Sequence, residues 1–339
     1  MLPPRGSTKS PITVRNLAAI DISIGSPVRS WRPRVLGADA AVRALAVSGG
    51  TVYVGGSFET LAGADVRSLG AVRLSDGSAV AGFAPDISGK VYTLLASPDR
   101  LYAGGAFGRV DGAGRLKLAA WDLPSRDLTS EWRPRAVGGS VRDMAFDASG
   151  DSIFLGGAFS EMAQSGSTYP GESVSKVDAR SGALRTWAIP EGKVGKPQVA
   201  WSLEATASRL HGGFGRGPNF AASFKPGGAV GTRGLAAPPR RQRAERRAVT
   251  ERQAPVRRWS LRARRALQQR TCGRPLRGLI SVRPSTGRVF CDWIPRLEPF
   301  GSNFNGPWTM SAVGNRLWVG GGFVRIGGVE QRNLARIRL

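Results

Sequence analysis

Hydrophobic residues occur along this chain in short runs that are separated by residues typical of turns. Residues 67–107 show the pattern, because apolar runs predict strands over residues 69–74, 78–83, 91–95 and 101–103. An Asp-Gly pair, a proline and a Pro-Asp pair lie between these runs and predict turns. Glycine makes up 46 of the 339 residues, which also favours tight turns and short strands over long helices.

One short word recurs about every 50 residues: two glycines at the end of an apolar strand, followed by phenylalanine. A degenerate copy lies at residues 211–214, and the gap before the last copy is about twice the usual length, so one copy is missing near residue 260. Glycine here is expected to permit a close approach of backbones, or a positive φ, where repeats meet. The word comprises Gly55, Gly56 and Phe58; Gly104, Gly105 and Phe107; Gly156, Gly157 and Phe159; and Gly320, Gly321 and Phe323.

Two further words run in phase with the glycine word. The aromatic residues that precede a proline are expected to pack in the core between adjacent repeats, and the alternative is a ligand cage. These residues are Trp31, Phe83, Trp132, Trp187 and Trp293. Apolar strands are predicted at residues 16–21, 68–72, 117–122, 174–178, 278–282 and 333–337, with a weaker copy at 219–224.

Four antiparallel strands that repeat about every 50 residues describe a blade of a β-propeller. The sequence therefore predicts an all-β propeller of six or seven four-stranded blades. Blades are expected over residues 12–233 and 269–339, after a disordered segment at residues 1–11. The first blade is expected to be incomplete, because the chain enters at the strand over residues 16–21, halfway through a repeat.

The three words together resemble the delta-60 repeat β-propeller family, and they are similar to kelch-like propellers and to the propeller of fungal cortical cell-polarity markers. The resemblance covers about residues 12–232 and 270–339. It implies a binding or scaffold module from a secreted or cell-envelope bacterial protein. For the chain itself we expect a monomer with an unknown protein or carbohydrate ligand on one face of the ring. The family has no established reaction, so the resemblance implies no catalytic residue.

Residues 234–268 break the repeat. The chain has 49 Lys and Arg against 24 Asp and Glu, a net charge of +25, and Arg240–Arg265 alone holds 11 arginines and two acids. A shift of one base lets the codons of Arg258, Trp259 and Ser260 encode the missing glycine pair, so the segment is interpreted as an out-of-frame blade. One alternative is a basic nucleic-acid-binding arm, which is disfavoured because aromatic residues are not interleaved with the arginines. The other is a disordered insertion.

Few residues offer chemistry. Cys272 and Cys291 form either a disulfide or a pair of buried thiols, and with His211 as the only histidine a Cys/His zinc site cannot be assembled. His211 lies on a predicted strand and is expected to be packed or solvent-facing rather than a catalytic base. Three acids follow glycine words in loops, and solvation is expected over binding of a hard cation: Asp65, Asp111 and Glu330.

The predicted function is that of a non-enzymatic module with no catalytic, cofactor or metal residue. No run of 18 apolar residues occurs, which excludes a transmembrane helix, and the N-terminus has no apolar h-region, so no signal peptide is expected in this chain. Two alternatives remain open. One is a propeller enzyme with a site at the channel mouth, and the other is binding of nucleic acid or another polyanion by the Arg-rich segment.

Overall fold

A computed structural model of the chain describes residues 13–21, 23–24, 26–164, 166–171, 173–187, 199–215, 220–225, 297–299, 307–313, 315–321, 323–330 and 334–338. Several predicted features lie outside these residues: the segments 1–11 and 234–268, Trp293, Cys272 and Cys291.

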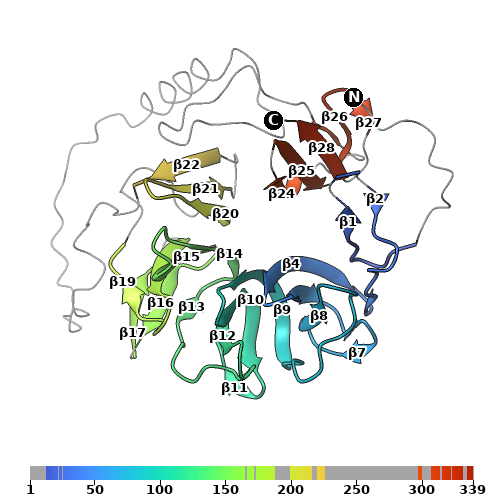
Figure 1. Cartoon of the computed structure of the whole chain (residues 1–339). Helices are drawn as coiled ribbons and strands as arrows, with labels where there is room; N and C mark the ends of the chain where they lie inside the picture. The colour runs from blue at the N-terminus through green and yellow to red at the C-terminus, as the bar shows by residue number, and fades with distance from the viewer. Residues whose placement is uncertain are drawn as a thin grey trace, which may run out of the picture. The chain divides into compact units, whose positions relative to one another are not determined.

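All regular structure in the described part of the chain is β-strand, so the prediction of an all-β fold is confirmed. The strands form many small antiparallel sheets. The chain divides into two compact units, Met1–Arg240 and Arg241–Leu339 (Figure 1). The number of blades, six or seven, stays a prediction.

Four main sheets follow one another along the first unit (Figure 1). Each has an edge strand, a central strand that carries a glycine pair, and a third strand that carries the apolar word. The first two are β4 (Ala41–Ser48), β5 (Thr51–Ser57) and β8 (Leu69–Arg73); and β9 (Ile87–Ala96), β10 (Arg100–Val110) and β12 (Leu118–Asp122), with β11 (Ala113–Gly114) also paired to β10. The next two are β14 (Val141–Phe146), β15 (Ser152–Gly157), β18 (Val174–Asp178) and β19 (Leu184–Arg185); and β20 (Ala200–Ala205), β21 (Leu210–Phe214) and β22 (Phe220–Phe224).

Shorter strands complete the two units. In the first unit they are β1 (Ile20–Asp21) with β2 (Ser26–Pro27); β3 (Val35–Leu36), β6 (Thr60–Leu61) and β7 (Ala64–Asp65); and β13 (Arg135–Val137), β16 (Glu161–Gln164) and β17 (Ser167–Pro170). The second unit contains β23 (Leu297–Pro299), β26 (Phe323–Ile326) and β27 (Val329–Glu330); and β24 (Pro307–Val313), β25 (Arg316–Gly321) and β28 (Leu334–Arg338).

The strands group differently from the four-strand unit predicted over residues 67–107. The apolar strand β8 pairs with β5, which precedes it, so each sheet straddles two sequence repeats. The strand predicted over residues 78–83 is reduced to a single bridge between Ala79 and Val72. Gly82 explains part of this loss, because its φ of 76° turns the chain out of an extended conformation.

Successive main sheets of the first unit bury their apolar faces against each other. One core cluster joins Leu69 of β8 to Val91 and Leu101 of the second sheet, all at most 2% exposed. The next cluster joins Leu118 of β12 to Ile153 of β15 in the same way. Because each sheet needs its neighbour to cover its apolar face, the sheets are the repeating unit of stability.

The glycine pair explains how closely these sheets pack. A Cβ on Gly104 would lie 2.7 Å from Val141 Cγ1, on the edge strand of the next sheet, and 2.8 Å from Thr93 Cγ2. A Cβ on Gly105 would instead overlap the carbonyl oxygen of Lys90. Neither glycine has a positive φ, so of the two expected reasons for glycine the close approach is the one that applies here. Gly55 and Gly156 likewise face the next sheet, and Gly56 and Gly157 face the backbone of their own edge strand.

Candidate functional site

Phe83, Trp132 and Trp187, which precede prolines, lie between successive main sheets of the first unit, and Trp31 packs against the first of these sheets. Trp132 is fully buried, its ring centroid is 5.2 Å from that of Tyr102, and its Nε1 donates a 3.2 Å hydrogen bond to the carbonyl of Asp178. Trp31 repeats this arrangement, with a 3.1 Å bond from Nε1 to the carbonyl of Arg73. Each indole is therefore tied to a strand end of the sheet that follows it in the chain.

The other members of the set are held by ring contacts. The Phe83 ring lies 5.3 Å from Tyr53 of one sheet and 6.1 Å from Trp121 of the next. Trp187 lies 5.3 Å from Phe154 and 6.3 Å from Phe224. The phenylalanines of the glycine word are also buried: Phe58, Phe107, Phe159 and Phe323. None of these rings forms an open surface for a ligand.

We expect Trp132→Phe to lower the free energy of unfolding by about 1–2 kcal/mol, since the indole bond to the Asp178 carbonyl is lost and the smaller ring leaves a small void. Urea denaturation of both proteins measures the difference. Trp201→Phe is the comparison, because that indole is 52% exposed and its loss opens no void. Equal effects of the two substitutions would contradict a packing role for Trp132.

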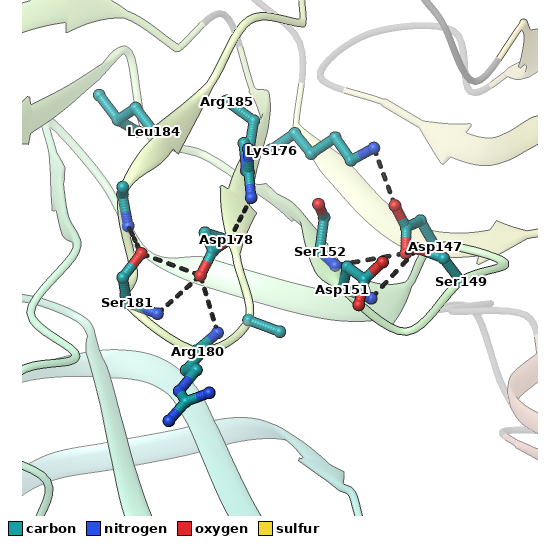
Figure 2. Close-up of polar contacts among 12 residues, drawn as sticks. Asp147, Ser149, Asp151, Ser152, Lys176, Asp178, Arg180, Ser181, Leu184 and Arg185 are labelled. Atoms are coloured by element: carbon teal, nitrogen blue, oxygen red, sulfur yellow. Dashed lines mark hydrogen bonds and ion pairs between the residues drawn. The ribbon is translucent and has the colours of Figure 1, made fainter.

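Carboxylates at the ends of the third sheet are used by the structure itself. Asp147 forms a 2.9 Å ion pair with Lys176. Asp178 accepts the backbone N–H groups of Arg180 at 2.9 Å and Ser181 at 2.7 Å, and it pairs with Arg185 (Figure 2). Burial alone would raise the pKa of Asp178, but the bonds from Ser181 and the pairing with Arg185 lower it to about 2. Such a carboxylate stays ionised and holds the turn, so it is a poor acid or base.

His211 and the loop acids do not come together as a reactive group. His211 lies opposite Glu204 on paired strands, and burial, followed by the charge of Arg209, lowers its pKa. Asp111 accepts the backbone N–H of Asp86 at 2.7 Å, which closes a loop. Asp65 and Glu330 belong to other hairpins. Within the described residues, no three potential metal ligands gather, and no helix is long and apolar enough to cross a membrane.

A different set of side chains, which the sequence did not single out, forms a continuous row. Each main sheet of the first unit has a β-bulge on its edge strand, opposite the glycine pair or its degenerate copy. At the bulge one residue is skipped in the strand pairing. The four skipped residues, here called the bulge row, are Arg43 of β4, Tyr92 of β9, Arg142 of β14 and Trp201 of β20. The bulge of β24 in the second unit falls at Trp308.

The bulge row alternates cations with aromatic rings. The Arg142 guanidinium carbon lies 4.2 Å from the centre of the Tyr92 ring and 5.0 Å from that of Trp201. The guanidinium carbon of Arg43 lies 5.6 Å from the Tyr92 ring. Such contacts hold a guanidinium against the ring and leave the edge of its plane free for hydrogen bonds. In Arg142 the Nε atom is itself buried and has no hydrogen-bond partner among the described residues. In the described part of the chain, neither arginine of the row forms an ion pair.

Asp143 lies next to Arg142 but binds backbone instead. One oxygen accepts the N–H of Leu203 at 2.6 Å, and the other accepts the N–H of Met144 at 2.9 Å and lies 3.4 Å from the Thr93 hydroxyl. These groups come from three successive sheets. Burial raises the pKa of Asp143 to about 6, against the lowering effect of these hydrogen bonds.

No protein-family model matches the chain, and no curated protein is significantly similar to it in sequence. Similar solved structures include the computationally designed Ika8 protein, at 11% identity and a TM-score of 0.39, covering 91% of this chain and 67% of that one. Another is the β-propeller domain of Cps50 (Swd1) from Myceliophteria thermophila, at 14% identity and a TM-score of 0.34, covering 57% of this chain and 54% of that one. The chain thus spans about half the length of the Cps50 domain.

Proposed function

We propose that this protein is a non-enzymatic β-propeller of six or seven blades, exported to the cell surface or envelope, that binds its ligand at the bulge row. One observation carries the proposal. Four successive sheets place Arg43, Tyr92, Arg142 and Trp201 at the same structural position, so that their side chains make one continuous row.

The position of the row supports a role in recognition. The bulged residue is free of the strand pairing, so its side chain is less constrained by the sheet than its neighbours are. Arginine and tryptophan are the residue types that contribute most to binding surfaces. The proposal of export is supported by the resemblance in sequence to propellers of bacterial envelope proteins.

A panel of defined polymers tests this function. We expect the purified full chain to retain at least one probe from a set of neutral oligosaccharides, charged oligosaccharides and proteins. The double variant Arg142→Ala, Trp201→Ala should weaken that retention by at least about tenfold, because two adjacent members of the row are lost.

Mass spectrometry of the recovered probe separates binding from catalysis. A probe recovered with unchanged mass agrees with a binding module, whereas a cleaved or modified probe would favour the enzyme alternative. Retention that the double variant leaves intact would show that the row is not the binding site.

A further inference from the structure

We infer that the bulge row binds an acidic oligosaccharide whose sugars carry carboxylate groups. This inference rests on the proposed function and names the ligand class of the same site. Its first support is charge. Arg43 and Arg142 contact the same tyrosine ring, and no described carboxylate neutralises either of them. Guanidinium groups held in this way are suited to bidentate bonds with carboxylates.

The acids nearest the row leave this charge in place. Asp143, the neighbour of Arg142, directs its oxygens to the backbone N–H groups of Leu203 and Met144. Glu204 is exposed on β20, opposite His211 in the strand pairing. Lys90, exposed on β9 two residues before Tyr92, adds a further cation. The row therefore carries a net positive charge.

The second support is the exposed ring at one end of the row. Trp201 is 52% exposed and is the one aromatic residue among the large hydrophobic side chains that lie exposed in the described part of the chain. Its Nε1 donates a 3.1 Å hydrogen bond to the carbonyl of Gly215, which fixes the orientation of the ring. A fixed indole offers an apolar face against which the C–H face of a sugar ring can stack.

The same geometry disfavours a single-stranded nucleic acid. Proteins that bind such strands stack successive bases on several aromatic platforms. In the bulge row both Arg43 and Arg142 lie over the Tyr92 ring, whereas Arg142 alone lies over the Trp201 ring, which is 52% exposed. Trp201 is therefore the one ring of the row that offers a platform. One platform beside two cations matches a chain of acidic sugars better than a run of bases.

Calorimetric titration of the full chain with oligogalacturonate tests the inference, and the methyl-esterified oligomer is the matched ligand because it has the same sugars without their charge. We expect oligogalacturonate to bind, with an affinity that falls as salt is raised from about 50 to 200 mM. The esterified oligomer should bind at least about tenfold more weakly, since it cannot pair with the guanidinium groups.

Variants locate the site. Trp201→Ala and Arg142→Lys should each weaken binding by about tenfold, the second because lysine keeps the charge but cannot form the planar bidentate contact. Arg67→Gln is the control, since it removes an arginine outside the row, 75% exposed and 3.8 Å from Asp86, and should leave affinity unchanged. Melting curves of all variants verify that they are folded.

Three outcomes would overturn the inference: no binding of oligogalacturonate, equal binding of the esterified oligomer, or unchanged affinity in Trp201→Ala and Arg142→Lys. If oligo-dT binds more tightly than oligogalacturonate through the same residues, the ligand of the row is a nucleic acid and not an acidic oligosaccharide. The proposed function is judged separately. If another panel probe is retained through the row while oligogalacturonate fails, the binding module stands and only its ligand class is wrong.

Discussion

Gly105→Ala is expected to lower the free energy of unfolding by about 3 kcal/mol or more. A Cβ at this position would overlap the carbonyl oxygen of Lys90 and lie 3.1 Å from Phe107 Cδ1. The overlapping atom belongs to the backbone of β9, which pairs with β10 on both sides of the bulge. Relief would therefore require a shift of paired backbone rather than a rotation of a side chain.

Two glycines on the same strand provide the controls. Gly108 has no atom within 4 Å of a Cβ position and no positive φ, so Gly108→Ala should be neutral or stabilise slightly through the unfolded state. Gly104→Ala should fall between the two, because its Cβ would meet the side chains of Val141 and Thr93, which can adjust. Urea denaturation gives all three values. Equal stability of Gly105→Ala and Gly108→Ala would show that the close approach of the Lys90 carbonyl is not what requires glycine at position 105.

The motifs that recur in the sequence predicted the strands well, because each motif reflects the local backbone geometry of one strand. The glycine pair appears on the central strand of described sheets in both units, and the apolar word forms β8, β12, β18, β22 and β28. The grouping of strands into sheets was predicted less well. A repeat in sequence does not show which neighbouring strand completes a sheet. The strand β8 pairs with β5, which precedes it in the chain.

The bulge row was missed because its members share a position rather than a residue type. Arg43, Tyr92, Arg142 and Trp201 each precede a small residue or Asp143, but their spacings of 49, 50 and 59 residues do not match those of the glycine pairs, 49, 52 and 56. Their alternation becomes meaningful only when neighbouring sheets bring the rings and guanidinium groups within contact. The burial of Asp143 was equally unpredictable, since Leu203 of another sheet supplies its shortest hydrogen bond.

Asp143 is expected to make the stability of the protein fall as the pH rises from about 4 to 7. Its pKa in the folded protein is raised to about 6, above the ordinary value of 3.8, so the folded state holds the proton more tightly than the unfolded chain. The contribution of Asp143 to the free energy of unfolding is complete below its pKa in the unfolded chain. It is lost as the pH rises through its pKa in the folded protein. The shift corresponds to about 2 kcal/mol, after allowance for the part of the side chain that water reaches.

The matched variant is Asp143→Asn, which has nearly the same shape but does not titrate. The N–H groups of Leu203 and Met144 bind different oxygens of Asp143, and in asparagine one of these oxygens is replaced by an NH2 group that cannot accept. The variant is therefore destabilised by an amount that does not depend on pH. The informative quantity is therefore the slope. The free energy of unfolding of the wild type, minus that of Asp143→Asn, should fall by about 2 kcal/mol between pH 4 and 7.

Asp178→Asn tests a pH dependence of stability that has the opposite sign. The pKa of Asp178 is lowered to about 2, so its stabilisation is present above the unfolded value of 3.8 and is lost as the pH falls toward 2. The two difference curves should thus slope in opposite directions and in separate pH windows, although both residues are aspartates of the third sheet. A flat curve for Asp143 between pH 4 and 7 would show that water reaches its carboxylate freely, and that the junction of the β9, β14 and β20 strands is more open than the hydrogen bonds of Asp143 imply.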